Sequence, residues 1–320
     1  MMLFIHKHQS VICALFVAFN MATSALAVEP ADSARARLQT NQSRLTLSAD
    51  LTARPGGNYH ITKDDKTVEQ GSTDAFTKAS LGVSYHIYSK GFSRLTASLR
   101  YNHLHQHFNS DNRLMDYGFT SSAHHQFAGN IMGMTYLRLW GKPLMVMGTV
   151  GCDFCQYGYE RWSAIGTAML MLKQTRQTQF GVGLIGLVNT FSKIPVFPMI
   201  TYRHTFNPQW TLNLTLPKFQ MEYHPSDKDM ISLGAGIDAD SYYIRPGVDE
   251  LPDHVRYSRS NINVGPTYEH RFACGLTFSA EAGVQLVMTN RIYRHDSSRE
   301  LATMHEKAAP FCHISLQQRF

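Results

Sequence analysis

Alternation of apolar and polar side chains recurs along almost the whole chain, and this period of two limits the fold more than any other feature. In residues 44–53, Leu and Ala occupy one parity, while Arg, Thr, Ser and Asp occupy the other. Residues 78–88, 276–286 and 310–320 repeat the pattern. Successive side chains of a β-strand point to opposite faces, so each segment is expected to be a strand with one apolar and one polar face. Helical spacing is hard to find after Ala27, and the sequence predicts an all-β protein.

The N-terminal residues have the three parts of a secretory signal peptide. A weakly basic start around Lys7 precedes the apolar run 11–19 and the small-residue site Ala25-Leu26-Ala27. The apolar run is much shorter than the roughly 20 residues that a transmembrane helix needs. We therefore expect a signal peptide at 1–27, a short periplasmic segment at 28–42 and one domain at 43–320.

An exported protein with this alternation is either a transmembrane β-barrel or a soluble β-sandwich or barrel. Small residues on the apolar faces suit a wall that faces lipid. Aromatic residues near segment ends suit an interfacial girdle; they are Tyr85, Tyr101, Trp162, Trp210, Tyr223 and Tyr268. With the export signal, these features predict a closed antiparallel transmembrane β-barrel in the outer membrane of a Gram-negative bacterium.

The strand count has a parity problem. The pattern gives thirteen segments, at 43–53, 78–88, 93–107, 119–140, 143–154, 160–174, 177–190, 195–206, 208–223, 229–240, 255–271, 274–290 and 310–320. A barrel with both termini in the periplasm needs an even number. Pro217 interrupts 208–223, because proline cannot donate a hydrogen bond within a strand. Splitting that segment gives fourteen strands, the preferred count, and losing one elsewhere gives twelve. The polar linkers 54–77, 108–118, 241–254 and 291–309 are then extracellular.

The polar faces carry ionised residues of both signs in mid-strand. One strand has Arg94, Thr96, Ser98, Arg100 and Asn102, and others add Arg203, Asp238, Arg259, Asn261, Asn263, Glu269, Glu281 and Gln285. Ionised groups that face each other across a narrow lumen are expected to pair. The pairs either form a network that only stabilises the barrel or line a narrow polar conduit without strong charge selectivity. The net charge of +6 is spread without basic runs, so nucleic acid is not an expected partner.

Two short motifs contain residues that bind metals or carry redox chemistry. His103, His105 and His107 share one face of a strand, but no nearby Cys or carboxylate completes a ligand set, so they are weak candidates and neither a metal nor a cofactor is expected. Cys152 and Cys155 form a C-x-x-C motif at the end of a β pattern, outside the helical setting that makes such a motif reactive. Either a local disulfide or two free thiols in an exposed loop would explain it.

Some outer-membrane barrels are enzymes that act on lipid, as a phospholipase or a lipid A deacylase does. Ser122 and His124, with Asn130 nearby, could form a nucleophile and base on the outer wall. No residue in the sequence is evident that would orient the base. The expected protein is therefore not an enzyme but a narrow channel, a porter or a surface-structural protein, and the lipid enzyme is the alternative.

Four segments together resemble an uncharacterised outer-membrane β-barrel family of the kind common in Bacteroidota. They are SSAHHQFAGN, GKPLMVMGTVGCDF, TQFGVGLIGLVNTFSKIPVFPMITYRHTFNPQW and the pair YEHRF and FSAEAGVQ, within roughly 120–290. The resemblance is one of composition. It implies the fold and the location, and it implies no activity and no site residues.

The chain ends on an alternating segment closed by Phe320. We expect residues 310–320 to be the closing strand, paired with 45–53 so that no strand edge is left open in lipid. Phe320 is predicted to be an insertion signal that barrel-insertion machinery recognises. Outer-membrane lipid is the other expected partner, and the oligomeric state stays open.

Overall fold

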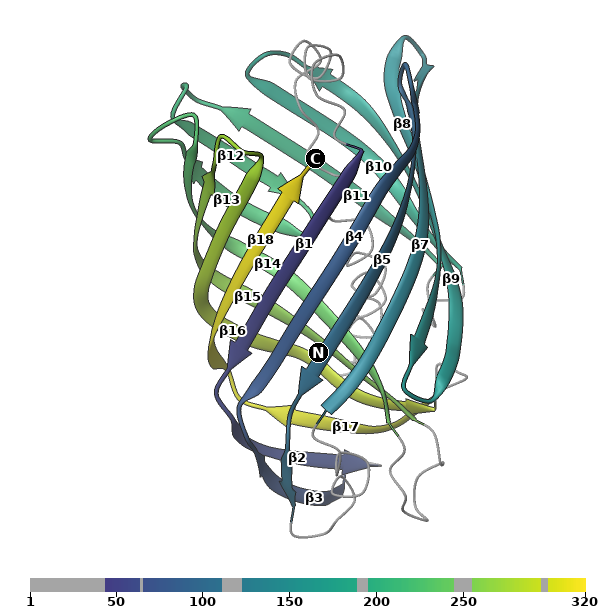
Figure 1. Ribbon diagram of the computed structural model, residues 1–320, viewed down its shortest axis with the longest axis vertical. Helices are drawn as coiled ribbons and strands as arrows, with labels where there is room; N and C mark the ends of the chain where they lie inside the picture. Colours follow the sequence, from purple (N-terminus) through teal and green to yellow (C-terminus); the bar gives the residue numbers. More distant parts are fainter. Residues whose placement is uncertain (1–43, 64–65, 111–122, 189–194, 245–254, 295–298) are drawn as a thin grey trace, which may run out of the picture.

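The chain forms a closed β-barrel in the computed structural model (Figure 1). The structure describes residues 44–63, 66–110, 123–188, 195–244, 255–294 and 299–320. Within these ranges every regular element is a strand, as predicted, and no helix is long and apolar enough to cross a membrane.

Fourteen of the eighteen strands make up the wall. In chain order they are β1 (Leu45–Arg54), β4 (Phe76–Lys90), β5 (Ser93–His105), β7 (Ala123–Leu139), β8 (Lys142–Cys155), β9 (Gly158–Gln174), β10 (Thr178–Val188), β11 (Val196–Thr205), β12 (Trp210–Thr215), β13 (Lys218–Tyr223), β14 (Asp229–Ile244), β15 (Val255–Arg271), β16 (Leu276–Arg294) and β18 (Ala309–Arg319). Each strand of the wall pairs antiparallel with the next, and the preferred count of fourteen is confirmed.

The barrel closes between its first and last strands, as the terminal pattern predicted. β1 and β18 pair from Thr46 with Arg319 to Ala53 with Cys312. The Phe320 N–H donates to the Leu45 carbonyl at 2.9 Å. Every strand of the wall therefore has a neighbour on each side over at least part of its length, as a sheet in lipid requires of its edges.

The segment 208–223 is two strands, and Pro217 marks their junction. β12 pairs with β13 from Trp210 with Tyr223 to Thr215 with Lys218, and the cis Leu216–Pro217 bond lies in the turn between them. This short hairpin pairs with only part of each neighbour: β12 with Thr201–Thr205, and β13 with Ile231–Gly236. The proline sits in the turn, where it removes no ladder hydrogen bond.

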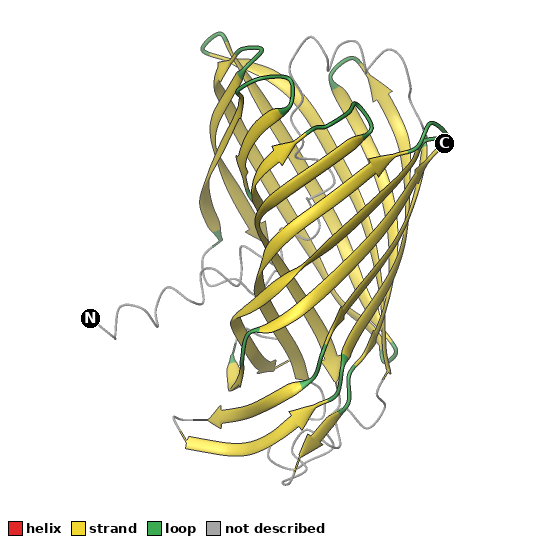
Figure 2. Cartoon of the chain, turned by 90° about the vertical axis from the view of Figure 1, so that its left-hand side faces the viewer, coloured by secondary structure: helices red, strands yellow, loops and turns green. Residues whose placement is uncertain are grey.

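The two ends of the barrel differ. The C-terminus and six turns of two to five residues lie at one end, called here the proximal end (Figure 1): 91–92, 140–141, 175–177, 206–209, 224–228 and 272–275. Four additional strands lie at the other, distal end (Figure 2). They are β2 (Gly57–Lys63), β3 (Lys66–Thr73), β6 (Phe108–Ser110) and β17 (Glu300–Glu306).

The linkers 54–77 and 291–309, in which the sequence predicted no strand, contain β2, β3 and β17. β2 pairs with β3 and with β17, β17 also pairs with β16, and β3 pairs with β6. Their polar composition hid the strands, but backbone groups that fold over a barrel opening still need hydrogen-bond partners. Strands β14 and β16 also run further than expected, to Ile244 and Arg294. Residues 111–118 and 245–254 of the other two linkers lie outside the described residues.

The outward face of the wall is apolar over a broad band. Leu81, Leu99, Ile131, Leu184 and Leu233 are 54–69% exposed, although they come from five different strands. A continuous exposed apolar belt of this kind is the lipid-facing surface of a transmembrane barrel.

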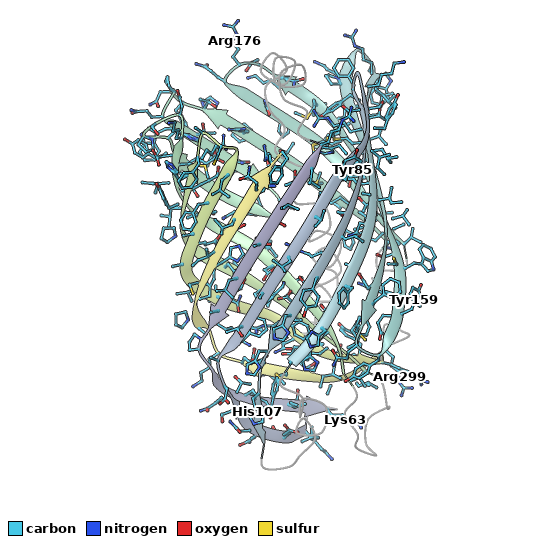
Figure 3. The ribbon with its side chains drawn as sticks, in the orientation of Figure 1. Lys63, Tyr85, His107, Tyr159, Arg176 and Arg299 are labelled. Carbon is cyan, nitrogen blue, oxygen red and sulfur yellow. The ribbon has the colours of Figure 1, made fainter. Side chains whose placement is uncertain are left out.

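All six aromatic residues predicted for the girdle lie on this outward face. Trp210 stacks near Tyr223 with ring centroids 4.9 Å apart, close to the proximal turns. Tyr101 lies against Phe127 at 4.9 Å, nearer the distal end. Figure 3 shows Tyr85 near the proximal end and Tyr159 near the distal end. The aromatic side chains thus form two belts, which matches the two interfaces of a membrane.

Candidate functional site

The inward face of the barrel is lined by ionised residues in pairs, as the sequence predicted. The pairs are Arg100 with Asp50 at 3.0 Å, Lys218 with Glu281 at 2.8 Å, Arg161 with Asp153 at 2.8 Å and Arg203 with Glu222 at 3.6 Å. Several join strands that are not neighbours in the sheet. The strand alternation explains this placement, because each residue belongs to the polar parity of its strand. Both signs are present in comparable numbers, so the wall has no dominant charge.

Two contacts cross the distal half of the lumen. Lys78 on β4 forms an ion pair with Asp240 on β14. The Gln126 side chain on β7 donates to the Ser241 carbonyl, also on β14. β14 is a neighbour of neither β4 nor β7 in the sheet. Opposite walls therefore touch here, and the lumen is narrowed.

A buried carboxylate holds the distal end together. Glu306, the last residue of β17, accepts from Arg54 at 3.3 Å and from Asn290 at 3.2 Å, and its second oxygen lies 3.5 Å from Arg259. The side chains of Glu306, Arg54 and Arg259 are 5%, 4% and 2% exposed. A buried charge is tolerated only when it is paired and hydrogen-bonded. Glu306 thus links β1, β15 and β16 to the strand that crosses the opening.

Apolar side chains fill the space around this ion cluster. We call them the mouth plug: Tyr59, Ile61, Phe76, Leu104, Phe108, Tyr242, Val255, Tyr257, Ile292, Ala302 and Met304. They come from the wall strands and from β2, β6 and β17. The Phe76 ring joins the plug to the ion cluster, with the Arg54 guanidinium 5.2 Å and the Arg259 guanidinium 5.9 Å from its centroid. Such cation–π contacts favour a desolvated cluster. The plug thus packs buried side chains of the wall and of the additional strands together at the distal end.

The outer rim of the plug carries a histidine pair. His60 on β2 stacks on His305 on β17, with ring centroids 4.6 Å apart. His305 also contacts the Thr62 hydroxyl at 3.1 Å. Burial, and secondly the neighbouring His60, lowers the pKa of His305. The neutral form of this imidazole is therefore the one that fits the pairing of β2 with β17.

The three histidines proposed as weak metal candidates lie on or beyond the outward face. His103 packs against His125 with ring centroids 4.9 Å apart, and the Tyr101 hydroxyl bonds to His125 Nδ1 at 2.7 Å. His105 ends β5, and His107 follows it at the distal end (Figure 3). Among the described residues, no group of three or more His, Cys, Asp and Glu is close enough to hold a metal ion.

The lipid-enzyme hypothesis placed a nucleophile and a base on the outer wall. Ser122 lies outside the described residues. His124 is buried and pairs in register with Leu104 of the mouth plug, and Asn130 pairs with Ser98. Both positions belong to the inward parity of β7, so the described part of this arrangement faces the lumen and not the lipid.

The C-x-x-C motif is not in a loop, as one interpretation expected, because β8 continues to Cys155. Cys152 belongs to the outward parity, whereas Cys155 belongs to the inward parity and bonds through its thiol to Glu160 at 2.7 Å. Strand alternation separates the two sulfurs. All four described cysteines are free.

The architecture defines the class: a closed fourteen-stranded barrel with an apolar outer belt and a polar lumen is an outer-membrane-type β-barrel. Residues 55–317 match a protein family described as Domain of unknown function (DUF6268), and the chain belongs to that family. The resemblance seen in the sequence to an uncharacterised barrel family is thus confirmed.

Solved structures that resemble this chain include a channel, a transporter and a porin. One is an outer membrane channel from Pseudomonas putida F1, with a TM-score of 0.45 and 9% identity, covering 92% of this chain and 100% of that one. Another is the P. putida toluene transporter TodX, with a TM-score of 0.42 and 10% identity, covering 89% and 92%. The KdgM porin has a TM-score of 0.31 and 8% identity, covering 85% and 99%. No curated protein sequence matches the chain.

Proposed function

We propose that this protein is a passive outer-membrane channel for small solutes, closed at its extracellular mouth by the mouth plug and its buried ion cluster. One observation carries the proposal: β17, a short strand outside the wall, lies at the opening and is tied to the wall through the buried Glu306 carboxylate. A barrel stabilised only by a filled interior would not need its opening covered by a separate strand. A covered opening above a polar lumen is what a closed channel requires.

The orientation follows from the ends of the barrel. Outer-membrane barrels have short turns on the periplasmic side and longer connections outside. The proximal end would then be periplasmic, and the distal end, with β2, β3 and β17, extracellular. The signal peptide expected at 1–27 and the apolar outer belt support an outer-membrane location. Outer-membrane lipid and the insertion machinery, through Phe320, are the proposed partners.

The paired lumen charges support weak charge selectivity. Arg100 and Asp50, like Lys218 and Glu281, neutralise each other close to the wall. No catalytic step is part of this function, since solutes would cross by diffusion. The conducting state would require β17 and the plug to move away from the mouth.

Single-channel recording in planar bilayers tests the proposal. The refolded full chain should insert and give discrete conductance steps that are short and infrequent, because the closed state dominates. Heat-modifiable migration on a gel, measured on the same sample, confirms that the barrel is folded. Glycine influx into proteoliposomes provides a second readout of a small hydrophilic solute. A folded barrel that is silent in both assays, even after Glu306 is removed, would restrict the protein to surface or structural roles.

A further inference from the structure

Methionine side chains gather on one side of the lumen wall. Of the 15 methionines in the chain, seven lie at inward positions of β7, β8, β9 and β11. They are Met132, Met134, Met145, Met147, Met169, Met171 and Met199. The register places them side by side: Met134 is opposite Met147, Met145 is opposite Met169, and Gly183 of β10 lies between Met169 and Met199.

Aliphatic and aromatic neighbours complete this surface, which we call the methionine wall. Ile165, Ile185, Leu187 and Phe197 are buried in one cluster with four of the methionines, Met145, Met169, Met171 and Met199. Met134, Tyr136 and Leu216 pack against its edges. At the inward positions of 132–136, 145–151, 163–171, 181–187 and 197–201 there is no Asp, Glu, Lys or Arg. The ionised pairs Arg100 with Asp50 and Lys218 with Glu281 belong to the other strands of the barrel. Arg161 with Asp153, and Arg203 with Glu222, involve strands of the wall but lie beyond its ends.

The methionine wall is buried: Met145, Met169 and Met199 are 0–2% exposed. The interior of a transmembrane barrel is usually polar, so a buried apolar stretch of this size is unusual there. Opening the wall to water would cost about 25 cal/mol for each Å² of apolar surface exposed. The apolar wall is complementary to a solute that has no charge and few hydrogen-bonding groups.

Methionine suits a surface that must adapt to its ligand. Its unbranched side chain has three rotatable bonds and a polarizable sulfur, so it can repack around molecules of different shape. Gly181 illustrates the fit: a Cβ there would lie 3.0 Å from the Met171 sulfur, so the glycine makes room for the thioether. The wall is therefore closely packed and also deformable.

We infer that the methionine wall is a binding track for uncharged apolar small molecules, of the size of a short hydrocarbon or a single aromatic compound. The solute would move along the wall by displacing thioether side chains, while the paired charges on the other strands stay hydrated. This inference rests on the proposed channel function and adds its substrate class.

Uptake by porin-deficient Gram-negative cells that express the full chain tests the inference. A neutral naphthylamine dye, which fluoresces on reaching cell lipid, is the apolar probe, and glycine is the hydrophilic probe. The triple variant Met145→Gln, Met169→Gln, Met199→Gln should lower protein-dependent dye uptake by roughly tenfold, equal to about 1.4 kcal/mol. Its glycine uptake should be equal or higher.

Two further variants test whether the effect comes from the polarity of the new side chains, from altered packing or from a general loss of barrel structure. The corresponding triple leucine variant keeps the wall apolar and should retain dye uptake. Met221→Gln lies on the outward face, 36% exposed, and should leave dye uptake unchanged. Heat-modifiable migration verifies that each barrel is folded.

The outcomes are distinguishable. Undiminished dye uptake in a folded triple glutamine variant would overturn the inference, as would dye uptake no greater than in cells without the protein when glycine uptake is present. Loss of dye uptake in the glutamine variant alone supports it. Absence of both fluxes in the wild type and in Glu306→Ala would instead defeat the channel function on which the inference rests.

Discussion

Removing the Glu306 carboxylate should shift the extracellular mouth from its closed toward its open state. In Glu306→Ala, Arg54 and Arg259 lose the one anion that both contact, and they remain 4% and 2% exposed. Removing one partner of a buried ion pair costs about 3–5 kcal/mol, because the other charge is left without compensation. The two guanidinium groups can regain hydration only if β17 and the plug move outward.

That cost acts on the equilibrium between the closed and the open mouth. Each 1.4 kcal/mol is tenfold, so about 3–5 kcal/mol shifts the open-to-closed ratio by roughly two to four orders of magnitude. A channel that is closed for most of the time should therefore become mostly open. Single-channel recording should show a large rise in open probability, and glycine influx into proteoliposomes should rise in parallel.

Glu300→Ala is the matched control, because Glu300 is the same residue type on the same strand. It pairs with Arg291 at 2.7 Å, but it is 33% exposed. Partly exposed pairs contribute only about 0–1 kcal/mol, so this variant should gate like the wild type. Unchanged open probability in a folded Glu306→Ala barrel would refute the idea that Glu306 keeps the mouth closed. An equal rise in Glu300→Ala would show that the effect is not specific to the buried ion cluster.

Three other perturbations follow from the structure. Deleting Phe320 removes a residue whose N–H closes the barrel seam, so folded outer-membrane protein should fall severalfold in a heat-modifiability assay; wild-type levels would contradict the insertion role. The pKa of His305 is lowered by burial and by a neighbouring imidazole, so the unfolded state binds more protons below the ordinary value of 6.5. The stabilising contribution is present above that value and is lost as the pH falls from it toward the lowered pKa. The protection factors of the β17 amides, which correct exchange rates for the intrinsic pH dependence of amide exchange, should thus be lower at about pH 5 than at about pH 7.5, and equal protection factors would contradict the shift. Gly275 has φ +84°, and a Cβ added there would lie 2.9 Å from the Arg319 carbonyl oxygen. Gly91 has φ +59° and no atom within 4 Å of such a Cβ, so it is the control. Gly275→Ala should lower the temperature at which the folded band is lost on a heat-modifiability gel more than Gly91→Ala does. The left-handed conformation costs both variants roughly 1–2 kcal/mol, so equal shifts would show that the close contact has no effect.

The barrel could be predicted from the sequence because its determinants are local. Alternation at a period of two assigns each side chain to the lipid or to the lumen, whatever its tertiary neighbours are. The seam between 45–53 and 310–320 follows, since a sheet in lipid cannot leave an edge unpaired. Pro217 located the turn that makes the strand number even, because proline cannot donate within a ladder.

The plug and the methionine wall could not be predicted in this way. Glu306 and Arg54 lie in or beside polar linkers and look like ordinary solvated residues until β17 brings one against the other. The methionines carried a signal that sequence reasoning missed: Met145 and Met147 share one parity of β8, and Met169 and Met171 share one parity of β9. Odd and even positions of these strands both carry mostly apolar side chains. Hydropathy alone therefore does not show which set of positions faces the lumen.

Three features followed from the pattern of residues alone: the class of fold, the closing strand pair and which ionised residues face inward. Each of these depends on strand periodicity and on the requirement that backbone groups in lipid be paired. Three others became visible only in the folded barrel: the buried plug at the distal end, the ion pair between Lys78 and Asp240 across the lumen, and the cluster of methionines. Those features depend on barrel curvature and strand register, which place residues distant in sequence within a few ångströms of one another.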